Sequence, residues 1–259
     1  MSDPSTPRER LWVGSVPIDV ITFAAAIDAI EELVTSGRGG SVFTPNVDHV
    51  VLAEEDARFR RAYADATLSL VDGTWVLWAS RALRKPLPEK ISGSDLMVPV
   101  IERAARRGFR VYLLGGGDGV AKRAAERLTE SYPDLVIAGY ESPRIDVDEP
   151  AEKRAELVAR VKATRPDIVF VCLGAPKQEL WIHDVTAALA PAVLLGVGAA
   201  IDFVAGTVQR APAWVSATGV EWLYRLVREP RRLWRRYLLR DPKFFAIVAR
   251  TRWSGAPRA

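Results

Sequence analysis

The amino-acid sequence predicts an α/β protein: a Rossmann-like, open and mainly parallel sheet with helices on both faces. Short aliphatic runs, such as residues 168–173 and 193–197, alternate with segments long enough to form helices. Strands that are almost continuously hydrophobic are buried on both faces, which is typical of a parallel sheet. The segment after residue 220 has no strand pattern, and it predicts a basic C-terminal helical appendage.

The expected elements follow one another without an internal repeat. Residues 12–20 predict a short strand or hairpin. Residues 22–36 predict a helix, since apolar side chains recur on one face at Phe23, Ile27, Ile30 and Val34. Gly39-Gly40 ends this helix before a strand at 41–43, and Asp48 begins the next helix. Further strands are expected at residues 68–71, 111–114, 135–138, 168–173 and 193–197.

We expect three segments: a disordered N-terminus (1–10), an α/β catalytic domain (11–208) and a membrane-facing helical appendage (209–259). The first ten residues are polar and lack the apolar core of a secretory signal. The lone Cys172 excludes an intramolecular disulfide, fits a reducing cytoplasm and is expected to be a small buried strand residue. The sequence contains no run of 18 apolar residues, so we expect no membrane-spanning helix.

The charge of the chain is concentrated in its tail. Residues 221–252 hold ten Lys or Arg against three acidic residues, a formal charge of +7; the whole chain carries +4, which leaves −3 for the rest. Arginines interleaved with aromatic residues are typical of a helix lying on anionic lipid. The same residues would serve a nucleic-acid-binding module, or the buried and solvated faces of a small helical subdomain.

Two polar segments follow predicted strands and precede helical patterns. They are Thr44-Pro45-Asn46 and Val71-Asp72-Gly73. Open α/β sheets bind ligands at the carboxyl ends of their strands, so a hydroxyl, an amide and a carboxylate meeting there predict a reaction centre. Asp72 also fits an ordinary turn or helix cap, and Asp202 is a competing acid at another strand end.

A glycine-rich turn follows the strand expected at 111–114. Gly115 to Gly119 suits a turn that binds a phosphate group, with Gly115 and Gly117 as candidate contacts, although a plain tight turn explains it equally well. The third glycine of the dinucleotide fingerprint is replaced by Val120. A nucleotide-dependent oxidoreductase is therefore an alternative function, with the missing glycine against it.

The segment Gly174-Ala175-Pro176-Lys177-Gln178-Glu179 also joins a strand to a helix. Gln178 and Glu179 are candidate substrate contacts: Gln178 offers both a donor and an acceptor to a hydroxylated ligand, although capping alone would also explain Glu179. Asp146 and Asp148 resemble a metal-binding pair but precede a helix, where acidic residues act as caps. His49 and His183 have no partner at zinc-ligand spacing, so we expect no metal site.

Six segments, in order, resemble the WecG/TagA/CpsF family of bacterial glycosyltransferases. The resemblance covers about residues 12–240. It is carried by the segments at 44–46, 71–73, 91–96, 174–179, 210–214 and 219–237. Members of the family carry an arginine at a position where this chain appears to have Lys90, which keeps the charge but not the bidentate geometry.

The resemblance implies inverting transfer of an N-acetylmannosamine-type sugar from UDP to polyprenyl-diphosphate-linked N-acetylglucosamine. No divalent metal and no other cofactor is expected. The family's proposed base corresponds to Asp72, and its substrate contacts to Thr44, Asn46 and Gln178. Such enzymes contribute to cell-surface polysaccharide or teichoic-acid-type polymers, which implies a cytoplasmic protein at the inner face of the membrane.

Without a metal, cationic side chains must stabilise the departing diphosphate. Lys90, Arg225, Arg232 and Arg235 are the candidates, which gives the basic tail two expected roles: covering the site and holding the protein against the membrane. The expected partners are thus a UDP-sugar, a lipid-linked acceptor and the membrane surface, with no nucleic acid. Self-association of the body is left open, because no heptad or symmetric pattern specifies how it would occur.

Overall fold

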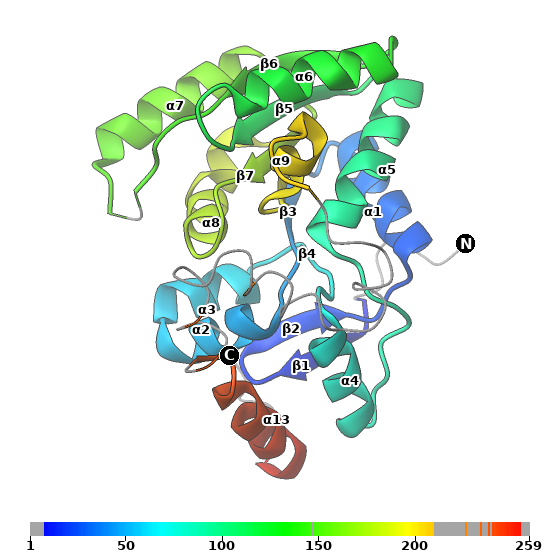
Figure 1. The fold of residues 1–259 in the computed structure, drawn as a ribbon, viewed down its shortest axis with the longest axis vertical. Helices are drawn as coiled ribbons and strands as arrows, with labels where there is room; N and C mark the ends of the chain where they lie inside the picture. The colour runs from blue at the N-terminus through cyan, green and yellow to red at the C-terminus, as the bar shows by residue number, and fades with distance from the viewer. Residues whose placement is uncertain are drawn as a thin grey trace.

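The computed structural model describes residues 8–146, 148–209, 226, 234, 238 and 240–254. Its centre is a six-stranded parallel sheet with the order β4-β3-β8-β7-β5-β6. Figure 1 shows this sheet with helices packed around it, so the predicted fold class is confirmed. The strands are β3 (Gly40–Phe43), β4 (Leu68–Ser69), β5 (Arg110–Gly115), β6 (Val136–Glu141), β7 (Ile168–Cys172) and β8 (Val193–Gly196).

The two faces of the sheet bury separate hydrophobic clusters. In β7, for example, Val169 and Val171 belong to one cluster and Phe170 to the other, because successive side chains of a strand point to opposite faces. One face is covered by α1 (Phe23–Thr35), α5 (Gly93–Arg107), α6 (Val120–Ser131) and α9 (Ala200–Ala205). The other is covered mainly by α2 (Val47–Glu55), α3 (Ala57–Ala64), α7 (Ala151–Ala163) and α8 (Lys177–Leu189).

The hairpin expected at residues 12–20 is present as a separate antiparallel sheet of β1 (Arg10–Val13) and β2 (Val16–Asp19). β1 thus begins one residue before the expected start of the catalytic domain. The carboxylate of Asp19 holds the hairpin in place, accepting from Arg10 Nε at 2.9 Å and from the backbone N–H of Ser69 at 2.7 Å. The hairpin is thereby joined to the end of β4.

The helical region after Asp48 is divided more finely than its pattern suggested. Asp56 ends α2 with an extended backbone, and its side chain accepts from the N–H groups of Arg58 and Phe59, which starts α3. This cap lets α3 turn back and contact α2 and α8. A further helix, α4 (Thr74–Ala82), follows the Asp72-Gly73 turn directly.

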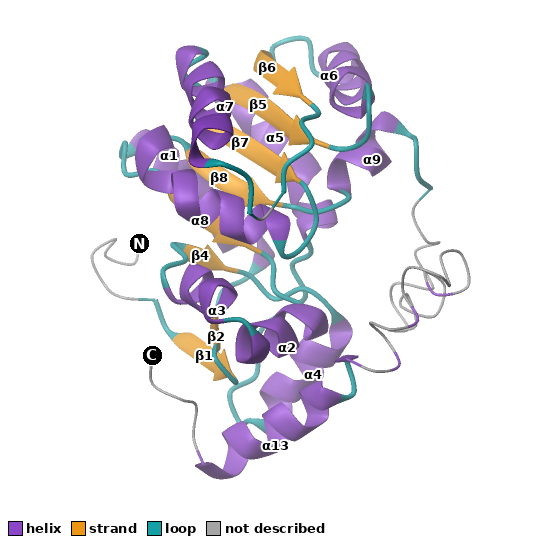
Figure 2. Ribbon diagram, turned by 90° about the vertical axis from the view of Figure 1, so that its left-hand side faces the viewer, coloured by secondary structure: helices purple, strands orange, loops and turns teal. Residues whose placement is uncertain are grey.

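The C-terminal helix α13 (Lys243–Ser254) packs on α2 and on β1. Figure 2 shows α4 and α13 together at the end of the molecule away from α6 and α7. The hydroxyl of Thr251 accepts from the backbone N–H of Gly14 at 3.0 Å, which joins α13 to the hairpin turn. Among the helices that the structure describes, none combines the length and apolar character needed to cross a bilayer.

Candidate active site

The carboxyl ends of β3 and β4 bring the two predicted strand-end segments together. Asp72 donates its backbone N–H to the carbonyl of Pro45 at 2.9 Å. A Cβ atom placed on Gly73 would lie 4.0 Å from Cβ of Asn46. Residues 44–46 and 71–73 therefore form one continuous rim (the rim, below) at the edge where open α/β sheets bind ligands.

Thr44 lies where β3, β8 and α5 meet. Its side chain is buried, and its hydroxyl donates to the carbonyl of Gly196 at 3.3 Å. A Cβ atom on Gly93 would lie 3.2 Å from Thr44 Oγ1 and 2.8 Å from Cα of Val197. Only glycine allows the first turn of α5 to approach Thr44 and Val197 this closely. The start of α5 therefore packs directly beneath the rim.

Asn46 is the N-cap of α2. Its Oδ1 accepts from the backbone N–H groups of Asp48 at 3.1 Å and His49 at 3.4 Å. Capping of this kind satisfies donors that the helix itself leaves without partners. The side chain of Asn46 is consequently held in one orientation at the rim by the helix that follows it.

A buried polar cluster lies behind the rim, formed by His49, Tyr63 and Glu179. His49 Nδ1 is 2.7 Å from the hydroxyl oxygen of Tyr63 and 4.0 Å from Glu179 Oε1. The three residues are 5%, 0% and 0% exposed. They come from α2, α3 and α8, and sequence spacing gave no sign that these helices converge, so the sequence prediction missed the cluster.

Three carboxylates act on Tyr63. Burial, followed by the negative charges of Glu179, Asp72 and Asp48, raises the pKa of the Tyr63 hydroxyl well above its ordinary value. Tyr63 therefore stays protonated at any physiological pH. The same interactions show that Asp72, at the rim, lies close enough to the buried cluster to act electrostatically on Tyr63.

Gln178 and Glu179 open α8 just inside the cluster. Gln178 Nε2 donates to Glu179 Oε1 at 2.7 Å, and Gln178 Oε1 accepts from the backbone N–H of Gly198 at 3.0 Å. Gln178 is only 3% exposed. The structure thus gives Gln178 a positioning role for the turn after β8, beside the substrate contact predicted from sequence.

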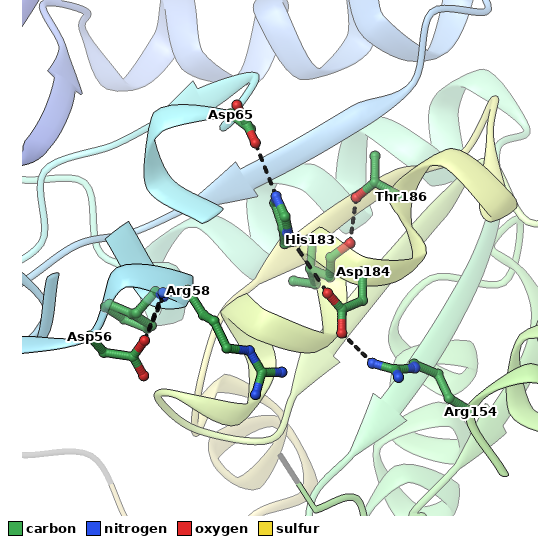
Figure 3. A network of polar contacts seen from close by, with 9 residues as sticks. Asp56, Arg58, Asp65, Arg154, His183, Asp184 and Thr186 are labelled. Carbon is green, nitrogen blue, oxygen red and sulfur yellow. Dashed lines mark hydrogen bonds and ion pairs between the residues drawn. The ribbon is translucent and has the colours of Figure 1, made fainter. Parts of the chain in front are cut away.

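The outer face of α8 is tied to its neighbours by the chain of polar contacts drawn in Figure 3. His183 Nε2 lies 3.0 Å from Asp65 at the end of α3, and its Nδ1 lies 3.6 Å from Asp184. Asp184 in turn pairs with Arg154 of α7. These contacts place α8 between α3 and α7, and with it Gln178 and Glu179.

Lys90 lies beside the end of β4. Its neighbour Ile91 donates its backbone N–H to the carbonyl of Val71 at 2.7 Å, next to Asp72. Lys90 Nζ is 3.8 Å from Asp95, whose carboxylate also accepts from the N-cap residue Ser92 at 2.6 Å. Lys90 is thus a partly exposed cation at the start of α5, close to the rim.

The glycine turn has a packing explanation at Gly115. This residue has φ +115°, and a Cβ atom there would lie 2.3 Å from the carbonyl oxygen of Cys172 in β7. Gly117 is different, because its Cβ position would meet Val120 at an ordinary 3.7 Å. Close strand packing therefore requires Gly115 without any ligand, whereas it does not require Gly117.

The loop after β6 is held over α8 and α3 by ion pairs and a hydrogen bond. Lys177 Nζ donates to the carbonyl of Ile145 at 2.9 Å and lies 3.9 Å from Asp146. Asp148 pairs with Arg58 at 3.1 Å. The cap interpretation of these acids was wrong: the N-cap of α7 is Pro150, with no side-chain cap bond, and Asp146 and Asp148 pair with Lys177 and Arg58 instead. Among the described residues, no cluster of three or more His, Cys, Asp or Glu is arranged to hold a metal ion.

Comparison with known families decides between the functional classes. The model of the Glycosyl transferase WecG/TagA/CpsF family matches residues 11–258. The chain belongs to this family. It is therefore a glycosyltransferase, and the resemblance seen in the sequence is confirmed. Membership favours a transferase over the oxidoreductase and the nucleic-acid-binding module.

Two similar relatives of known name come from Bacillus, and both are called N-acetylglucosaminyldiphosphoundecaprenol N-acetyl-beta-D-mannosaminyltransferase. The protein of Bacillus spizizenii is 33% identical over 221 residues, covering 85% of this chain and 83% of the relative. The protein of Bacillus subtilis (strain 168) is 29% identical over 237 residues, covering 91% and 90%. The family match and both alignments span the sheet, the rim and α8.

Asp202, the competing acid, follows β8 rather than β3 or β4. It lies in the first turn of α9, where its backbone carbonyl and Oδ1 accept from the Thr207 hydroxyl at 3.1 and 3.4 Å. The competing acid therefore helps to close its own short helix.

The tail arginines Arg225, Arg232 and Arg235 lie outside the residues that the structure describes. Arg240, which the sequence prediction did not select, lies 3.3 Å from Asp48 of α2. Arg240 therefore joins the described part of the tail to α2, next to His49 of the buried cluster.

Proposed function

We propose that this enzyme transfers an N-acetylmannosamine-type sugar from UDP to polyprenyl-diphosphate-linked N-acetylglucosamine, inverting the anomeric centre, in cell-surface polysaccharide or teichoic-acid-type synthesis. The names of both Bacillus relatives support this donor sugar and acceptor. The observation that carries the proposal is the convergence of Thr44, Asn46 and Asp72 on one rim, with the buried polar cluster directly behind it.

Asp72 acts as general base in this proposal. It accepts the proton of the acceptor hydroxyl as that oxygen bonds to the anomeric carbon. The bond from the anomeric carbon to the diphosphate breaks at the opposite face, and its electron pair leaves with UDP. General-base assistance contributes about 10²–10⁴ in rate. Asp72 suits this role because it is half-buried at the rim, with the rigid Thr44 and Asn46 beside it.

The leaving UDP requires positive charge, which we assign to side chains rather than to a metal. Lys90 is the described cation next to Asp72, and Arg225, Arg232 and Arg235 of the tail complete the proposed set. Preorganised cations in a site closed off from water stabilise developing charge strongly. The proposal gives the tail its role as a cover over the rim.

The donor nucleotide can extend along the sheet edge toward the glycine turn. β3 and β5 are three strand positions apart, which corresponds to about 14 Å at the usual spacing. Gly117 and the opening of α6 lie at the far end of this path, and the turn held by Gln178 lies between. Gly117 is the better candidate for a diphosphate contact, because packing already explains Gly115.

The direct test measures UDP release from UDP-N-acetylmannosamine, with and without a lipid-diphosphate-N-acetylglucosamine acceptor, in buffer containing EDTA. We expect release that depends on the acceptor, persists in EDTA and gives a β-linked product from an α-linked donor. Release that stops in EDTA and returns with a divalent cation would contradict the metal-independent form of the proposal. Within a panel of UDP-sugar donors, no release from UDP-N-acetylmannosamine would contradict the assigned sugar.

A further inference from the structure

The outer face of α4 carries large aromatic side chains where a surface helix normally carries polar ones. Trp75 and Trp78 are 37% and 48% exposed, whereas the small residues Ala79 and Ser80 face the core. Tryptophan is usually among the more buried residue types, so this inverted arrangement requires a cause. The packing of α4 does not supply one, because its inward side chains already fill that contact.

Helix α13 extends this exposed apolar surface. The ring of Phe245 lies 5.7 Å from that of Trp75, and Trp75 lies 5.1 Å from Trp78. Phe245 and Trp253 are 58% and 83% exposed. We call Trp75, Trp78, Phe245 and Trp253 the aromatic face; both ribbon views place its helices at the end of the molecule opposite β6 (Figures 1 and 2).

The charges carried by α4 and α13 themselves are all positive. Neither α4 nor α13 contains an acidic residue, and exposed Arg81, Arg84 and Arg252 lie on or beside them. The acids beneath α13 are already engaged, because Glu54 pairs with Arg250 and Glu55 with Lys243, each at 2.5 Å. Indole rings bordered by arginines are the combination that favours the interface of an anionic bilayer.

We propose that the aromatic face docks on anionic phospholipid, with α4 of the catalytic body inserting together with α13. The basic tail alone was expected to meet the membrane; here the body itself supplies two of the four aromatic anchors. The proposed partner is lipid rather than a second copy of the chain. A second copy would bring the same arginines against themselves, and like charges directly opposed are unfavourable.

The position of α4 connects docking to chemistry. This helix begins at Thr74, directly after Asp72-Gly73, so Trp75 is only three residues along the chain from Asp72. Resting on the proposed function, a lipid-linked acceptor can keep its chain in the bilayer while its sugar reaches Asp72. Docking would thus deliver the acceptor at the rim without removing it from the membrane.

The test measures co-flotation of the full chain with vesicles of phosphatidylglycerol and phosphatidylcholine, against vesicles of phosphatidylcholine alone. We expect binding that needs the anionic lipid and falls about tenfold or more in Trp75→Ala/Trp78→Ala. Tyr140→Ala is the matched control, because Tyr140 is 43% exposed on β6 at the opposite end of the molecule. That variant should bind as the wild type does.

Three results would overturn the proposal. They are a wild type that ignores anionic vesicles, a double variant that binds them as tightly as the wild type, and a wild type that self-associates through the aromatic face instead of binding vesicles. If the double variant fails to fold, the exposed pair Arg81→Glu/Arg84→Glu serves instead and should lose binding similarly. Flotation needs no substrate, so a failure of docking and a failure of the proposed transferase reaction are measured separately.

Discussion

At the scale of single residues, the contact between His49 and Tyr63 links α2 and α3 behind the rim. His49 Nδ1 and the Tyr63 hydroxyl oxygen are 2.7 Å apart, and both side chains are buried. Removing one member of a buried hydrogen bond costs the desolvation of the group that remains. The raised pKa of Tyr63 means that its hydroxyl keeps its proton throughout the neutral and mildly alkaline range.

Replacing Tyr63 with Phe should therefore lower the free energy of unfolding by about 1–3 kcal/mol, without a change in side-chain volume large enough to open a cavity. Urea denaturation followed by circular dichroism measures this loss. Tyr140→Phe, an exposed tyrosine on β6, is the control and should change stability by less than about 0.5 kcal/mol. Equal stability of the two variants would show that the buried hydroxyl contributes nothing.

At the scale of elements, α13 is held against α2 and the hairpin by buried side chains, ion pairs and one hydrogen bond to the hairpin turn. Phe244 and Ile247 are buried, and Thr251 meets the hairpin turn at Gly14. Gly14 has φ +57°, and a Cβ atom there would lie 2.6 Å from both Glu54 and Ile247. The packing of α13, the hairpin turn and α2 is therefore interdependent. Weakening this junction should let α13 detach from the body as one cooperative unit.

Thr251→Val tests that junction. The variant keeps the shape of the side chain but removes the oxygen that accepts from Gly14, so the opening free energy of α13 should fall by about 1–3 kcal/mol. Hydrogen exchange of α13 and the hairpin turn should speed up, while that of the central sheet stays constant. Thr129→Val is the control, since the Thr129 hydroxyl bonds only within α6, to Ala125. Unchanged exchange at α13 would refute the dependence.

At the scale of the whole molecule, the features that could be predicted from sequence are those that depend on residues close together in the chain. Continuous aliphatic runs predicted the parallel strands, and polar residues just after two of them predicted the rim. The junction of Asp48 with Arg240 spans 192 residues, and the His49–Tyr63–Glu179 cluster joins three helices whose packing no spacing encodes. Those contacts depend on tertiary packing, which is why they could not be predicted from the sequence.

The single cysteine reports on this whole-molecule packing. Burial raises the pKa of the Cys172 thiol to about 12, so the folded protein keeps it protonated and shielded. Labelling by a thiol reagent at pH 8 should therefore follow global unfolding in urea. The unfolded thiol loses its proton first as pH rises, so stability should fall between about pH 9 and 12, by up to about 1.4 kcal/mol per unit for this group.

Two results would contradict this account of Cys172. One is rapid labelling of the native protein at pH 8, which would show that the sheet opens near β7 without global unfolding. The other is an alkaline decline in stability that is the same in Cys172→Ala as in the wild type, which would assign it entirely to other groups.

The central claim is that Asp72 at the rim is the catalytic base, and paired variants test it most directly. UDP release from UDP-N-acetylmannosamine with the lipid-linked acceptor would be measured for wild type, Asp72→Asn and Asp202→Asn, after confirming that each is folded. The account predicts that Asp72→Asn loses about 10²–10⁴ in kcat while Asp202→Asn stays close to wild type. Full activity in Asp72→Asn, or a collapse confined to Asp202→Asn, would contradict it.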